Sequence, residues 1–285
     1  MGFAKSSTHS TDPFLGIDRL IELPSAPGNA PGQSYPPVRG QLALQLGRNW
    51  SYNAPADWRI LSSATTKDRN DMYNPPLFRE QNREILQQLI RNARLATLVC
   101  NGSDGLPEVS HLPLLLDAGD GENGSLLGHF ARANPHWKTL SSNPDAVAIF
   151  MGPDAYVSPT WYPTKQVHHK HVPTWNYETV HAICKAEIFD DAERLRDVVS
   201  QLTHRHEAHR AVPWDIDQAP ADFIAAQLKG IVGIKLTIVE LEGKRKLSQN
   251  RVPEDREGVR NALASSEDPI DNEVSASMME LHDRS

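Results

Sequence analysis

Apolar and polar positions are patterned along most of the chain after residue 71, and this pattern predicts a β-rich domain. Strands are expected where β-branched and apolar residues lie between turn residues: at 94–100, 108–116, 125–130, 146–151, 155–159, 174–189 and 231–244. Pro113, inside the second of these, predicts a sheet edge or a bulge. Several antiparallel strands at short spacing, with few helices between them, favour a small barrel of the mostly β, α+β class.

Helical spacing is confined to a few stretches. Within 79–93, four apolar residues recur at helical intervals: Ile85, Leu86, Leu89 and Ile90. Further helices are expected near 190–209 and 219–228, as an insertion packed on one end of the barrel, and near 254–264. No internal repeat is present.

The two ends of the chain differ from its middle. Residues 1–71 are rich in Ser, Pro, Gly and Ala without sustained apolar periodicity, and we expect a disordered or weakly ordered extension. Residues 266–285 are acidic and are expected to form a poorly ordered tail. The sequence therefore predicts one domain over 72–265.

Composition narrows the class of protein. The chain has 285 residues, of which 39% are hydrophobic and 23% charged, as in a globular protein. A net charge of -7 argues against a broad nucleic-acid surface. No apolar run is long enough for a membrane span, and no signal peptide is evident. The two cysteines, Cys100 and Cys184, fit free thiols in a reducing cytoplasm.

The stretch GHFARANPHWKTL, residues 128–140, looks like a strand that turns into a short helix. Asn134 can cap that helix and Pro135 suits its first position. Arg132 and the helix N–H groups can then hold an anion such as a phosphate. Hydroxyl side chains at 158, 160, 164 and 174, together with Lys165, offer further phosphate contacts.

Histidine and tryptophan crowd the middle of the chain. Ten of the twelve histidines lie between His111 and His209, with four tryptophans in or near that interval. A planar ligand held by stacking is one interpretation, and an aromatic core is the other. The runs HHKH at 168–171 and HRHEAHR at 204–210 lack the spacing of a zinc motif, so no metal site is predicted.

Several long stretches together resemble the PaiB family of FMN-binding negative transcriptional regulators. They are MYNPPLF, SHLPLLL, LLGHFARANPHWKTL, AIFMGPDAYVSPTWYPTK, VPTWNYETVHA and IVGIKLTIVELEGKRKLSQN, in that order between residue 72 and about 265. The resemblance implies a split β-barrel, similar to that of the pyridoxamine-phosphate oxidase group. It also implies a homodimer that binds FMN at the subunit interface.

By this resemblance the flavin would contact the second and third strands, the turn after them, and two later strands. The implied cofactor-binding residues are Ser110, His111, Leu112, His129, Ala131, Arg132, Asn134, His136, Trp137, Tyr156, Ser158, Trp161, Lys165, Thr174, Trp175 and Asn176. The oxidases carry Arg and Lys on the second strand, where this chain has VSHLPLLL, so no catalytic residue is carried over.

The functional expectation is a cytoplasmic FMN-binding regulator, redox-responsive, with a direct or indirect DNA target. A flavin-dependent reductase or oxidase is an alternative. A haem-binding or haem-degrading protein is another, with His111, His129 and His181 as axial candidates. Direct DNA binding finds little support, because no helix-turn-helix pattern is present and the one basic run is GKRK at 243–246.

Overall fold

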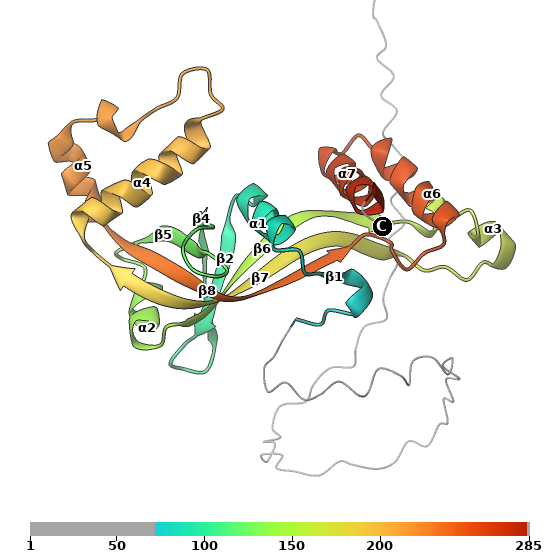
Figure 1. Ribbon diagram of the computed structural model, residues 1–285, viewed down its shortest axis with the longest axis horizontal. Coiled ribbons are helices and arrows are strands. Elements are labelled where there is room, and N and C mark those ends of the chain that lie inside the picture. The colour runs from blue at the N-terminus through green and yellow to red at the C-terminus, as the bar shows by residue number, and fades with distance from the viewer. Residues whose placement is uncertain (1–71, 284–285) are drawn as a thin grey trace, which may run out of the picture. The chain divides into compact units, whose positions relative to one another are not determined.

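A computed structural model describes residues 72–283 (Figure 1). The prediction for residues 1–71 lies outside this range. The strands are β1 (Arg79–Glu80), β2 (Ala96–Asn101), β3 (Pro107–Leu112), β4 (Leu115–Asp117), β5 (Ser125–Ala131), β6 (Asp145–Val157), β7 (Thr174–Phe189) and β8 (Ile231–Lys246). The helices are α1 (Arg83–Asn92), α2 (His136–Ser142), α3 (Lys165–His168), α4 (Ala192–Glu207), α5 (Ala221–Leu228), α6 (Pro253–Ala264) and α7 (Pro269–Asp283).

The strands form one antiparallel sheet in the order β3-β2-β6-β7-β8-β5-β4, with β1 added beside β8. The sheet coils around a central core and makes an α+β split barrel, as predicted. The sheet is built around the pairing of β7 with β8, which extends from Tyr177 opposite Lys246 to Phe189 opposite Gly233. The single strand expected at 108–116 is two strands, β3 and β4, which Pro113 separates and which lie at the two ends of the strand order.

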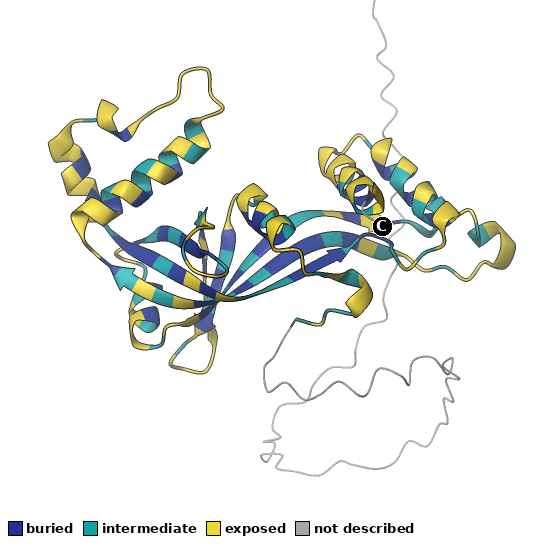
Figure 2. Cartoon of the chain, in the orientation of Figure 1, coloured by how far each residue is buried: buried dark blue, intermediate teal, exposed yellow. Residues whose placement is uncertain are grey.

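Apolar side chains at alternate positions of the strands fill the barrel. Leu98, Ala148 and Ala182 come from neighbouring strands and are fully buried in the main core (Figure 2). Helix α1 adds Leu86 and Ile90 to this core. The helix begins after Asn82, whose side chain accepts hydrogen bonds from two backbone N–H groups of the first turn.

Two helical lobes lie at opposite ends of the long strands (Figure 1). Helices α4 and α5 pack around Leu195 and Ile224 at one end, which is the predicted helical insertion. Helices α6 and α7 cover the far ends of β6 and β8 at the other, around Val259 and Leu263.

The prediction of a disordered tail over 266–285 was wrong for its described part. Residues Pro269–Asp283 form α7, in which Val274 and Met278 are buried. These two residues and Leu281 recur at helical spacing and pack on α6, although acidic residues surround them. Tertiary packing therefore outweighs the polar composition.

Two boundaries also differ from the sequence expectations. The strands expected at 146–151 and 155–159 are one strand, β6, with an irregularity in register between Met151 and Asp154. Such a bulge lets a strand bend without ending. The helix expected from residue 79 begins at Arg83, because Arg79 and Glu80 pair with β8.

A buried ion pair joins β7, β8 and α7. Arg245 on β8 donates through Nε to Glu178 on β7, and both side chains are almost fully buried. Arg245 Nη2 donates to Glu280 of α7 at 3.1 Å, and Ser277 Oγ donates to the second oxygen of Glu178 at 2.6 Å. The pair thus fixes α7 to the sheet.

We expect Glu178→Ala to lower the free energy of unfolding by about 3–5 kcal/mol, because it leaves a buried guanidinium without its nearest carboxylate. The matched control on the same strand is Glu187→Ala, which breaks an exposed pair with Arg194 and should cost under about 1 kcal/mol. Urea denaturation measures both. Similar losses in the two variants would contradict the structural role given to the buried pair.

Candidate functional site

The sheet face opposite the core carries two aligned rows of side chains, which we call the outer platform. Strand register sets each row, because side chains in register on neighbouring strands point to the same face. The first row is His111, Thr97, Ile149, His181 and Glu242, and the second is Val109, Val99, Val147, Ile183 and Glu240. The platform therefore crosses β3, β2, β6, β7 and β8.

The platform is apolar at its centre and polar at its margins. Val99, Val147 and Ile149 are half-buried, whereas Val109 is 51% exposed. Thr97 Oγ1 and His111 Nδ1 are hydrogen-bonded at 3.2 Å. Burial lowers the pKa of His181, and the neighbouring Lys244 ammonium lowers it further. A flat apolar surface with neutral hydrogen-bonding groups beside it suits a planar heterocycle.

The predicted turn gathers a second polar group, on the core side of β3. Asn134 Oδ1 accepts from the His136 N–H at 3.0 Å, so Asn134 caps the turn before α2, as expected. Its amide donates to Ser110 Oγ at 3.1 Å, and Ser110 Oγ lies 2.8 Å from His136 Nδ1. Leu112 is buried in the core beside them, and Ala131 ends β5. The structure thus brings Ser110, Asn134 and His136 together.

Arg132 anchors this turn to β8. Its Nε and Nη2 donate to the carbonyls of Lys229 and Ile231, both at 2.9 Å, and its own N–H donates to Gly230. Trp137 Nε1 donates to the Arg132 carbonyl at 3.1 Å. Two guanidinium donors are therefore already in use, and a phosphate contact from Arg132 stays a prediction.

The remaining predicted residues lie at the far ends of β6 and β7. They are Tyr156, Ser158, Trp161, Lys165, Thr174, Trp175 and Asn176. Tyr156 is eight residues along β6 from Ala148, the position level with Ser110, which is about 25 Å at strand spacing. One chain therefore does not bring the two predicted groups into a single site.

Several of these distal residues have structural partners. Asn176 is fully buried and is hydrogen-bonded to Ser248, and Trp161 packs against the core of the α6–α7 lobe. Ser158 caps the turn Pro159–Trp161, and Lys246 donates to Thr174 at 2.8 Å. Lys165 begins α3. Tyr156 and Trp175 are both about half exposed and meet edge to face, with ring centroids 5.9 Å apart.

Two of the three histidines considered for haem lie far apart. His111 and His181 share a row of the platform but are separated by three strand spacings, about 14 Å. These two side chains therefore cannot ligate one iron within the described chain. His129 lies on β5, and burial lowers its pKa.

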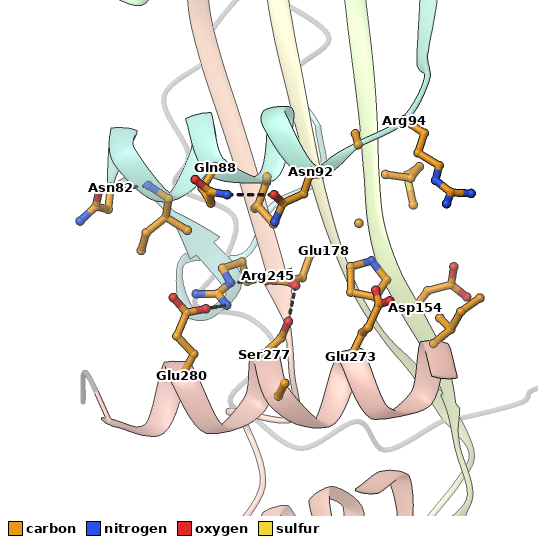
Figure 3. A pocket seen from close by; sticks show the side chains of 18 of the residues that line it. Asn82, Gln88, Asn92, Arg94, Asp154, Glu178, Arg245, Glu273, Ser277 and Glu280 are labelled. Atoms are coloured by element: carbon orange, nitrogen blue, oxygen red, sulfur yellow. Dashed lines mark hydrogen bonds and ion pairs between the residues drawn. The ribbon is translucent and has the colours of Figure 1, made fainter. Parts of the chain in front are cut away.

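A cavity of about 1180 Å³ lies between α1 and α7 (Figure 3). None of the predicted site residues lines it. Four carboxylates labelled around it, Asp154, Glu178, Glu273 and Glu280, outnumber the guanidinium groups of Arg94 and Arg245. This excess of negative charge disfavours a flavin phosphate. This cavity could not be predicted from the sequence, because residues 266–285, which include α7, were expected to be disordered.

Comparison with known proteins defines the family. Residues 72–240 match the family described as "Putative FMN-binding domain". The chain belongs to this FMN-binding family. It is 34% identical over 198 residues to the Bacillus subtilis "Protease synthase and sporulation protein PAI 2", covering 70% of this chain and 92% of that protein. The resemblance to the PaiB family is thereby confirmed.

Two further matches extend the range of relatives of this FMN-binding family member. An uncharacterized protein of Emericella nidulans is 33% identical over 222 residues, covering 66% of this chain and 88% of that protein. Among solved structures, the FAD and haem binding protein of Mycobacterium smegmatis aligns with a TM-score of 0.46 at 18% identity, over 62% of this chain and 78% of that one. Within residues 72–283, no helix has both the length and the apolar character required to cross a membrane.

Arg132→Ala should lower the free energy of unfolding by about 1–2 kcal/mol without any flavin, because it removes two charge-assisted hydrogen bonds to backbone carbonyls. Arg132→Lys should recover only part of this loss, since one ammonium lacks the two-pronged geometry of the guanidinium. Calorimetry of the flavin-free protein measures both. An unchanged melting temperature in Arg132→Ala would show that the anchor contributes nothing.

Stability should decrease as the pH falls below about 6.5, because burial lowers the pKa of His129 and His181 from the ordinary 6.5. Above that pH both side chains are neutral in both states. Below it the unfolded chain takes up protons that the native state resists, so unfolding becomes more favourable. Urea titrations at several pH values should give a shallower dependence of stability on pH for His129→Gln than for the wild-type protein, and equal slopes in the two proteins would contradict this account.

Proposed function

We propose that this protein is a cytoplasmic FMN-binding homodimer in which the outer platform forms one wall of each flavin site. The family supports the cofactor. The observation that carries the location is the platform itself, since helices α1 and α2 of the described residues pack on the core face instead. An isoalloxazine ring lying there would contact Val99, Val147 and Ile149 on its face, and Thr97 and His111 at its edge.

These residues would bind and orient the ring rather than react with it. Their apolar faces exclude water, and the Thr97–His111 pair offers a hydroxyl and an imidazole for the polar edge of the ring. When bound, FMN supplies electron or hydride exchange, and the protein contributes position and polarity.

A second copy of the chain is the natural cover for the platform. Binding sites usually enclose 70–90% of a ligand's surface, and an open sheet face cannot do so alone. The exposed Tyr156–Trp175 pair lies too far away to help within one chain, but a partner can bring its own pair to the site. The partner's pair would then lie beside His111, the predicted residue that belongs to the platform.

A regulatory role is the finer part of the proposal. The Bacillus relative is named for protease synthesis and sporulation. Direct DNA contact through GKRK at 243–246 is disfavoured, because Lys244 is 7% exposed and Arg245 2%. We therefore infer that the regulatory signal is the redox state of the flavin, passed on through another protein. The reductase or oxidase alternative requires an acceptor, and turnover assays with NADH or NADPH would reveal it.

Val147→Glu should separate the copies and weaken FMN binding at least about ten-fold, because it places a charge at the centre of the apolar platform. Phe223→Glu, on exposed α5, is the matched control and should change neither property. Flavin titration and sedimentation velocity measure binding and assembly, and an absorption spectrum distinguishes flavin from haem. Unchanged FMN affinity in folded Val147→Glu would place the cofactor elsewhere.

A further inference from the structure

Three side chains with metal-ligand chemistry meet inside the barrel, beneath α2. They are Cys100 of β2, Glu108 of β3 and His136 at the start of α2, and their ligand atoms all lie within 4.8 Å of one another. Cys100 and Glu108 are directly paired across the hairpin of β2 and β3. Their side chains therefore project to the same, inner face.

His136 has the bonding pattern of a metal ligand. The side chain is buried, with the residue 2% exposed, and Ser110 Oγ holds Nδ1 at 2.8 Å. Nε2 is buried and has no hydrogen-bond partner. A metal-bound histidine typically has one ring nitrogen fixed by a neighbouring group while the other binds the ion. Asn134, which also donates to Ser110, steadies this arrangement.

The Glu108 carboxylate likewise has one ligand atom held by a neighbouring group and the other without a partner. Its Oε1 accepts from Thr139 Oγ1 at 3.1 Å, while Oε2 is buried without a partner. Buried polar atoms without partners are uncommon in native proteins, and two of them facing one thiol require an explanation. A divalent cation would satisfy both. A thiolate and a carboxylate would also balance its two positive charges, so that the occupied site is neutral.

We propose that Cys100, Glu108 and His136 bind one zinc-class divalent cation. Sulfur, imidazole and carboxylate are the ligands zinc takes in proteins, and three protein ligands leave a fourth position for water. Zinc–ligand bonds of 2.0–2.3 Å at tetrahedral angles put ligand atoms about 3.3–3.8 Å apart, so the ligand atoms, now within 4.8 Å of one another, would approach by up to about 1.5 Å on binding. The proposal does not rest on the proposed flavin function.

Cobalt(II) added to the metal-depleted full-length protein tests the site, because cobalt bound to a thiolate shows sulfur-to-metal charge-transfer absorption. We expect this band at one ion per chain, with displacement by zinc. Cys100→Ser should abolish it. Cys184→Ser is the matched control, since Cys184 is also a buried free cysteine, lies on β7 and donates its thiol hydrogen to the Ala182 carbonyl. The band should persist in this variant. Glu108→Gln should weaken cobalt binding at least ten-fold.

The charge-transfer band also separates this site from the histidine runs at 168–171 and 204–210, which can bind cobalt only through nitrogen. Ser110→Ala should lower the affinity by about ten-fold, because it releases the ring that presents Nε2. Thermal unfolding confirms that each variant is folded. No band in the wild-type protein, or a band that survives in folded Cys100→Ser, would overturn the proposal.

Discussion

The fold depends on the long antiparallel pairing of β6, β7 and β8. Because side chains alternate along a strand, one register decides both the barrel core and the outer platform. Ala182 of β7 faces the core, and its neighbours His181 and Ile183 face outward. A slip by one residue would exchange the two faces, so the many buried apolar contacts of the core also hold the platform in position.

The length of the long strands explains why one chain does not bring all the predicted site residues together. The long strands continue past the barrel to the lobe of α6 and α7, where the Glu178–Arg245 pair fixes α7 to the sheet. Residues near Ser110 and residues near Tyr156 are therefore held rigidly apart. In the proposed dimer, a second copy placed against the platform would bring its aromatic pair from one end of the strands to His111 at the other.

The sequence predicted what depends on local pattern. Residues 174–189 were expected as a strand and form β7 with the same bounds, because alternation and turn residues mark both ends. The sequence did not predict the features that depend on tertiary contacts. Helix α7 owes its order to packing of Val274 and Met278 on α6, and Arg132 owes its role to carbonyls about a hundred residues later. Val99, Val147 and Ile149 lie in predicted strands, and the strand pairing shows that they share the outer face.

The hairpin of β2 and β3 carries both the flavin wall and the cation cluster. Val99 and Val109 pair on the outer face, and Cys100 and Glu108, the next residues along, pair on the inner face. Adjacent pairs of one ladder share backbone hydrogen bonds, so a change of spacing at the inner pair shifts the outer one. Helix α2 contacts the inner face of the hairpin through His136. The turn that precedes α2 is anchored to β8 by Arg132, so the hairpin is held in place on its inner face. An ion bound there would stiffen the surface on which the second copy and the ring are proposed to rest.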